Sequence, residues 1–310
     1  METSSPVEIS AEDAAAIAEA LASLVRERLE DEAWDWFART RDMLRTSKED
    51  RTLYIALGLA PRRLGKEDLL SSSPSSREIA LIEKAAACRA GWSPRHWSVD
   101  QAARVVFLLT RYHGEEGEFF ALMERLFRTA DVGELICFYQ ALPLYPGQAL
   151  YLQRAREGAR TNMRPVFEAV AHRNPYPRER FDEEAWNQMV LKALFIESRL
   201  DPILGLDERA NPELARMLLD YAHERWAAGR PVSPELWRCV GPFARDEALE
   251  DLGRVLDSDD PLERMAASLA LAASPDPRAR RLLEESGSEF ARAALAGQLS
   301  WSGLAARMAS

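Results

Sequence analysis

Four side chains that can exchange protons or bind anions lie within two helical turns: Asp220, His223, Glu224 and Arg225. An imidazole beside carboxylates can act as a general acid or base. On a helical wheel, however, Asp220 and His223 fall on the polar arc, with Glu224 at its edge, as on a solvated helix face. Two roles therefore stay open for these three residues: they are acid/base groups of an enzyme, or they belong to a solvent-exposed helix face.

Arg225 differs from its neighbours, because its wheel position lies between those of Leu214 and Leu218, in the middle of the apolar stripe. A guanidinium buried without a partner is costly. We therefore expect Arg225 to bond a carboxylate such as Asp207, or carbonyl groups, or an anionic ligand.

A second set of candidates lies in the segment that precedes this helix. Asp182 is placed to cap a helix over 183–196 that is apolar almost all round, with Trp186 among its apolar residues. Gln188 and Lys192, four residues apart, form its main polar stripe. Either the Lys192 head reaches water at the end of a buried stem, or the stripe lines an internal cleft. The preceding prolines predict an extended lead-in around Tyr176 rather than a helix.

Start signals for helices recur along the whole chain, and they set the fold class. Asn211-Pro212 predicts a helix beginning at Pro212, and Asp260-Pro261 and Asp276-Pro277 repeat the same N-cap and N1 pattern. The repeat resembles the helical hairpins of HEAT-like solenoids. We predict an all-α superhelix of packed helical hairpins with HEAT-like repeats at the C-terminus. The acidic run 257–260 is interpreted as a capped turn, with an acidic metal or diphosphate site as the alternative.

The organisation along the chain is predicted as four segments of one continuous domain. They are an N-terminal helical segment (1–70), helical hairpins (71–171), a signature core (172–245) and a HEAT-like tail (246–310).

Composition and missing motifs exclude several classes of function. The net charge of −10 and pI of about 5.2 argue against nucleic acid as a partner. Three scattered cysteines, an acidic N-terminus and the lack of a long apolar run predict a cytoplasmic chain without a transmembrane segment. Ala227 occupies the position where a zincin helix needs its second histidine. Because no cofactor or metal motif occurs, neither group is expected.

Residues 174–243 resemble the EboA family of metabolite-traffic proteins, and a weaker likeness begins near residue 50. The family motif matches at Asn174, Tyr176, Asn187, Gln188, Lys192, Asp207, Arg209, Asn211, Asp220, His223, Glu224, Arg225, Trp237 and Arg238. Glu197 and Arg199 depart from the small or apolar residues expected there. The resemblance implies a bacterial gene cluster for making or exporting a secondary metabolite, with a prenyltransferase-like membrane enzyme among its members. It implies no settled reaction.

Two hypotheses of different classes follow. The first is a non-catalytic binding or adaptor protein for a small metabolite or for other proteins of the cluster, including the membrane enzyme. Its expected ligand-binding residues are Tyr176, Trp186, Gln188, Lys192, Asp207, Arg209, Arg225, Trp237 and Arg238. The second is an enzyme acting on a prenylated or cyclitol-like intermediate, with His223, Glu224 or Asp220 as acid/base. The absence of a known catalytic signature favours the first.

Overall fold

The computed structural model describes residues 8–47 and 49–309. These residues form helices and no strand, apart from a single bridge between Asp68 and Ser98. The chain divides into two compact units, Met1–Phe181 and Asp182–Ser310. The predicted all-α class is therefore confirmed. None of the helices in the described ranges is both long enough and apolar enough to cross a membrane.

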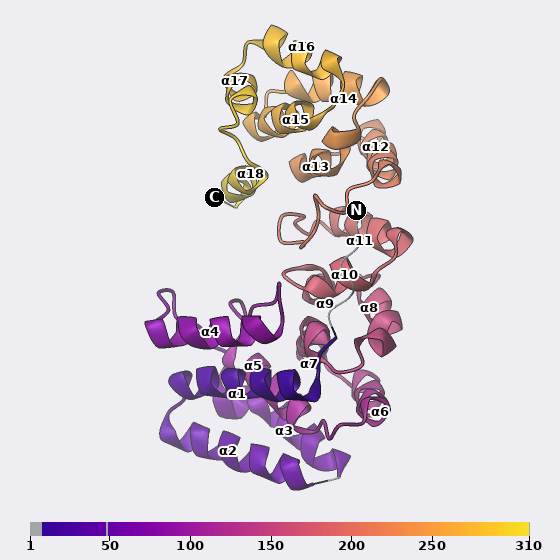
Figure 1. Ribbon diagram of the computed structural model, residues 1–310. Helices are drawn as coiled ribbons and strands as arrows, with labels where there is room; N and C mark the ends of the chain where they lie inside the picture. Colours follow the sequence, from indigo (N-terminus) through magenta and orange to yellow (C-terminus); the bar gives the residue numbers. More distant parts are fainter. Residues whose placement is uncertain (1–7, 48, 310) are drawn as a thin grey trace. The chain divides into compact units, whose positions relative to one another are not determined.

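The first unit is built from helices of six to eighteen residues (Figure 1). They are α1 (Ala11–Arg28), α2 (Asp31–Thr46), α3 (Asp50–Leu64), α4 (Ser76–Cys88), α5 (Val99–Thr110), α6 (Glu116–Phe127), α7 (Val132–Gln140), α8 (Leu152–Gly158), α9 (Arg164–Ala171) and α10 (Pro175–Arg180). Short 3₁₀ turns at Leu142–Leu144 and Gln148–Tyr151 join α7 to α8.

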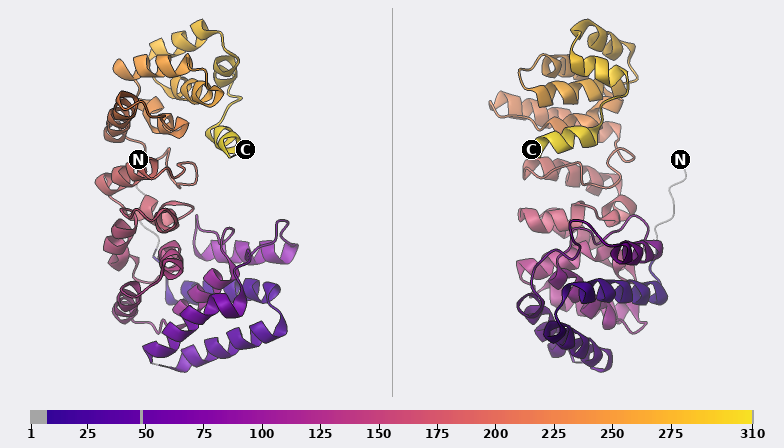
Figure 2. Two further views of the ribbon diagram at one scale, coloured as in Figure 1. Left: turned by 180° about the vertical axis from the view of Figure 1, so that it is seen from behind. Right: turned by 90° about the vertical axis from the view of Figure 1, so that its left-hand side faces the viewer.

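Helix α5 forms the centre of the first unit. Ten of its residues are buried, and α1 packs along it and along α4 (Figures 1 and 2).

The burial of Arg89 just after α4 is accommodated by hydrogen bonds. Its guanidinium donates to the Pro143 carbonyl and to both carboxylate oxygens of Glu179. A buried arginine is stable in such a setting because its donors are used.

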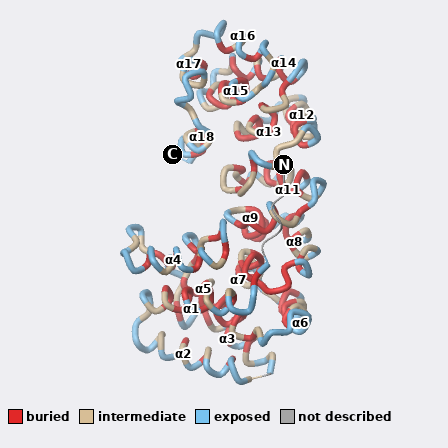
Figure 3. Tube along the Cα trace, in the orientation of Figure 1, coloured by how far each residue is buried: buried red, intermediate tan, exposed pale blue. Residues whose placement is uncertain are grey.

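The second unit continues the helical order. It contains α11 (Glu183–Phe195), α12 (Pro212–Ala227), α13 (Trp237–Val240), α14 (Glu247–Leu256), α15 (Pro261–Ala273), α16 (Pro277–Ser286), α17 (Glu289–Leu295) and α18 (Trp301–Met308). Helix α15 contacts α13, α14, α16, α17 and α18, and its inner residues are buried (Figure 3). Asp260 and Asp276 cap α15 and α16 through Leu262 N and Arg278 N, so both predicted helix starts are confirmed.

The expectation of an extended lead-in around Tyr176 is wrong, because Pro175–Arg180 forms the short helix α10. Asn174 starts it, since its side-chain oxygen accepts the Tyr176 N–H at 3.0 Å. Pro175 and Pro177 both fall in the first turn. Backbone N–H groups there have no partner within the helix, so the prolines lose no hydrogen bond.

Candidate functional site

Helix α12 is positioned by the residue that caps it. The Asn211 side-chain oxygen accepts the Leu214 N–H at 2.8 Å, which confirms the predicted start of the helix. The amide of Asn187 on α11 exchanges two hydrogen bonds with the Asn211 amide, at 3.2 and 2.8 Å. This amide pair ties α12 to α11 and so fixes where Arg225, in the last turn of α12, projects.

Arg225 lines a cavity of about 370 Å³ in the second unit, which we call the Arg225 pocket. Its walls come from the end of α11, from α12, from the 231–235 loop and from α15 and α18. Apolar side chains cover much of the wall. They include Leu194, Tyr221, Val232, Pro234, Leu262 and Met308.

The Arg225 guanidinium is half-buried and only partly used. Its Nε donates to the Pro231 carbonyl at 3.0 Å. Among the described residues no carboxylate lies within ion-pair distance of it, and Asp207 pairs with Arg238 instead. Of the three kinds of partner that the sequence left open for Arg225, the structure shows a carbonyl. The other N–H groups of the guanidinium belong to a side chain that lines the Arg225 pocket.

Glu235, which the sequence did not single out, holds the loop on one side of this pocket. Its carboxylate is 3% exposed and accepts hydrogen bonds from Leu200 N, Asp201 N and the Arg199 Nε, each at 3.0 Å. Because its acceptors are filled from within the protein, Glu235 has a structural role. Glu197, one of the two departures from the family pattern, adopts a positive φ of 56° on the same wall.

Comparison with known families decides the relationship. A model of the family described as metabolite traffic protein EboA matches residues 17–241. The chain belongs to the EboA family. No curated protein and no solved structure matches it. The matched range contains Arg225 and the 231–235 loop, whereas the part of the pocket wall formed by α15 and α18 lies beyond it.

Two of the predicted EboA ligand-binding residues form an ion pair with each other. Arg238 donates to both oxygens of Asp207, at 2.6 and 2.7 Å, and to Asp201 at 3.1 Å. Next to this pair along the chain, Trp237 is buried and stacks on Trp226, with ring centroids 5.8 Å apart. Neither Arg238 nor Trp237 lines the Arg225 pocket.

The predicted residues on and near α11 lie in different environments. Trp186 is fully buried, and the Arg209 guanidinium lies 4.6 Å from the centre of its ring. Gln188 is exposed, so it lines no internal cleft. Lys192 is half-buried, with its Nζ 5.1 Å from the centre of the 68% exposed Phe195 ring. Whether the Lys192 ammonium group lies in solvent or in a cleft stays a prediction.

The acid/base candidates lie on the outer side of α12. Asp220 is exposed and pairs with Arg216 at 2.7 Å, and Glu224 is exposed. The His223 Nε2 atom lies 2.7 Å from a carboxylate oxygen of Asp251 on α14, a partner that the sequence did not indicate. The His223 side chain is 37% exposed, and none of these groups lines the Arg225 pocket.

Tyr176 belongs to the first unit and is fully buried there. Its hydroxyl donates to the Gln148 carbonyl at 2.6 Å, and burial raises the pKa of the phenol well above its usual value. Tyr176 therefore remains a neutral core residue whose hydroxyl is already used.

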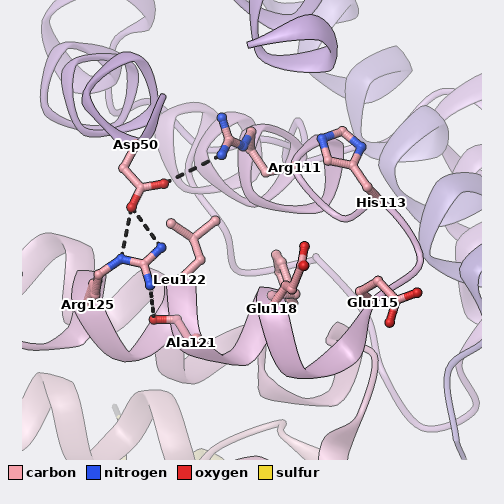
Figure 4. A pocket seen from close by; sticks show the side chains of 9 residues that line it. Asp50, Arg111, His113, Glu115, Glu118, Ala121, Leu122 and Arg125 are labelled. Carbon is pink, nitrogen blue, oxygen red and sulfur yellow. Dashed lines mark hydrogen bonds and ion pairs between the residues drawn. The ribbon is translucent and has the colours of Figure 1, made fainter. Parts of the chain in front are cut away.

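A larger cavity, of about 440 Å³, lies in the first unit, and charged side chains on its wall pair with one another. Figure 4 shows Asp50 between Arg111 and Arg125, with His113, Glu115 and Glu118 on the wall farther from Asp50. Asp50 accepts from the Arg125 Nε at 2.9 Å, and it lies 3.6 Å from an Arg111 nitrogen. Both guanidinium groups are thus engaged with a carboxylate, whereas Arg225 has no carboxylate partner among the described residues.

Proposed function

We propose that this EboA-family chain is a non-catalytic protein that binds a small metabolite in the Arg225 pocket. One observation carries the proposal: a half-buried guanidinium lines a cavity, gives one N–H to a carbonyl and has no carboxylate partner among the described residues. The family's description as a metabolite traffic protein fits such a role.

The walls define the chemistry of the ligand. The volume of about 370 Å³ is within the usual range for small-molecule sites. Tyr221, Val232 and Met308 offer apolar contact, and Arg225 can hold one anionic or carbonyl group. Because the carboxylates of Glu235, Asp260 and other acids also line the cavity, a polyanion is disfavoured. The ligand is therefore an apolar molecule with a single acceptor group.

The test compares small molecules that co-purify with the wild-type protein and with Arg225→Gln from a host that makes the metabolite. Wild type is expected to carry a defined compound, and the variant to lose it at least about tenfold, since a charge-assisted hydrogen bond contributes about 1.5–3 kcal/mol. Arg230→Gln is the matched control, because Arg230 is exposed and lies outside the pocket wall. Equal loading of both variants, or an empty wild-type protein, contradicts the proposal.

The wider setting comes from the family resemblance. We propose that the chain hands its metabolite to other proteins of the same gene cluster, among them the prenyltransferase-like membrane enzyme, through a HEAT-like concave face. We also place it in the cytoplasm, since Cys88, Cys137 and Cys239 are unpaired, as is usual in a reducing compartment.

An enzymatic role is the second candidate, and the His223–Asp251 hydrogen bond is the observation that favours it. A carboxylate that orients an imidazole is common in acid/base catalysis. Cys239 offers no nucleophile, because burial raises the pKa of its thiol to about 12. Recovery of a compound that purified wild type converts to a product would favour this candidate; recovery of an unchanged compound favours the carrier.

A further inference from the structure

The first unit contains a smaller cavity, of about 200 Å³, that has no part in the proposed function. We call it the Trp92 cavity. Its walls come from the loop between α4 and α5, from α7 and from α9 with the turn that follows it. Its lining is polar and aromatic and includes Trp92, Ser93, His96, Gln140 and His172.

Three buried polar atoms around this cavity have no hydrogen-bond partner among the described residues. They are the indole Nε1 of Trp92, the hydroxyl of Ser93 and the amide Nε2 of Gln140. Trp92 is 3% exposed, so bulk water does not compensate its N–H. Unpaired buried donors are rare in proteins and costly. All three atoms belong to residues that line the Trp92 cavity, so a ligand in this cavity is where we expect the missing acceptor.

Three of the acceptor side chains around the cavity are already used inside the protein. The Asn174 side-chain oxygen accepts from Tyr176 N, and the Gln101 side-chain oxygen accepts from Ser98 N. The Glu168 carboxylate accepts from the Arg164 Nε at 2.8 Å. The unpaired groups that remain are an N–H donor, an N–H₂ donor and a hydroxyl, so a molecule in the cavity has to bring the acceptor oxygens.

Two charged groups line the cavity, Arg173 and the Glu168 carboxylate, and Glu168 is already paired with Arg164. Arg173, which adopts a positive φ of 51°, contributes to the lining, and the buried donors themselves are neutral. Burial, together with the nearby Arg173 and Arg95, lowers the pKa of His96, with Asp68 acting in the opposite direction. With Glu168 paired to Arg164, the exposed Arg173 and the neutral donors suit a single negative charge better than a dianion.

We propose that the Trp92 cavity is a second ligand site: the Trp92, Gln140 and Ser93 side chains turn their buried donors toward the cavity and bind the carboxylate of a small molecule. The cavity is below the usual range for drug-sized ligands, so the molecule is small. This proposal does not depend on the Arg225 pocket, because the two sites lie in different units and share no residue.

The test uses benzoate as the probe, on the full chain labelled with ¹⁵N at the tryptophan indoles. The sequence has eight tryptophans, and the spectrum of Trp92→Phe identifies the Trp92 signal. Benzoate is expected to move the Trp92 indole proton downfield with a Kd on the order of 1 mM. Benzyl alcohol, which lacks the charge, is expected to bind more weakly, and benzylamine is expected to leave the signal in place.

Matched variants separate a ligand site from a packing defect. Gln140→Met removes the donor at similar length and is expected to weaken benzoate about tenfold, as loss of a hydrogen bond to a charged group does. Gln153→Met, on the exposed side of α8, is expected to leave the Kd unchanged. An unmoved Trp92 signal at saturating benzoate, or equal affinity of wild type and Gln140→Met, overturns the proposal. Arg225→Gln does not affect this measurement, so the two proposals fail separately.

Discussion

The Arg225 pocket and the Trp92 cavity are both proposed to bind an acceptor group, but their polar side chains differ in how far the protein itself satisfies them. Around Arg225 most charged groups are paired within the protein. The Glu235 carboxylate accepts from two backbone N–H groups and from Arg199, whereas the Arg225 guanidinium uses only part of its donors. Around Trp92 the buried groups are neutral, and three donors are unpaired. Whether the donors and acceptors of a polar group already have partners in the protein is therefore a better guide to its role than its charge or how seldom such a residue occurs.

The same comparison separates Arg225 from two other arginines, of which Arg238 belongs to the EboA motif and Arg89 does not. Arg89 and Arg238 are as polar as Arg225, but each holds a carboxylate with two hydrogen bonds. A guanidinium held in this way has few donors left for a ligand. Among the described residues Arg225 bonds only the Pro231 carbonyl, and this difference separates it from Arg89 and Arg238.

The largest effect is expected where a filled acceptor is removed. Glu235→Ala leaves Leu200 N, Asp201 N and Arg199 without this partner, and we expect it to lower the stability of the second unit by about 3–5 kcal/mol. Hydrogen exchange followed by mass spectrometry is expected to show lost protection within residues 182–309. Glu224→Ala, at an exposed carboxylate, is the control and is expected to change stability little. If Glu235→Ala and Glu224→Ala changed stability equally, the structural role of Glu235 would be contradicted.

An effect of opposite sign and smaller size is expected where an unfilled donor is removed. Gln140→Met deletes an unpaired buried amide and is expected to stabilise the ligand-free protein by about 1 kcal/mol. Urea denaturation of the wild type and the variant measures the difference.

Tyr151→Phe provides the comparison for that gain. The Tyr151 hydroxyl is also buried and unpaired among the described residues, and it does not line the Trp92 cavity. We expect a similar gain in stability with benzoate binding unchanged. If Gln140→Met were to destabilise the protein, its amide would have a partner within the fold, and the contrast between the two regions would disappear.

The sequence predicted what local chemistry fixes. Asn211, Asp260 and Asp276 were identified as caps because a cap acts within three residues of itself. The helix after Asn174 is not predicted, because the two prolines favour an extended segment unless they fall in the first turn of a helix. The wheel position of Arg225 predicts a polar partner for it, and the Pro231 carbonyl is one of the three kinds of partner left open.

Contacts between residues far apart in the sequence cannot be predicted from such local patterns. Glu235 meets Leu200 across more than thirty residues, and His223 meets Asp251 on another helix. The Trp92 cavity joins a loop, α7 and α9, and no spacing in the sequence brings Trp92 to Gln140. Such meetings depend on how whole helices pack, and a single sequence carries no local signal of that packing.

The smallest effect is expected at a contact outside both sites, which sets the scale for the others. The Arg254 guanidinium lies 4.4 Å from the centre of the Trp226 ring on the surface of the second unit. An exposed cation–π contact contributes about 0.5–1 kcal/mol, so Arg254→Met is expected to lower stability by no more than that. Urea denaturation measures the loss, with Arg245→Met, at another exposed arginine, as the control. A loss as large as that of Glu235→Ala would mean that the Trp226 surface, with Trp237 beneath it and His223 beside it, supports the second unit as strongly as Glu235 does.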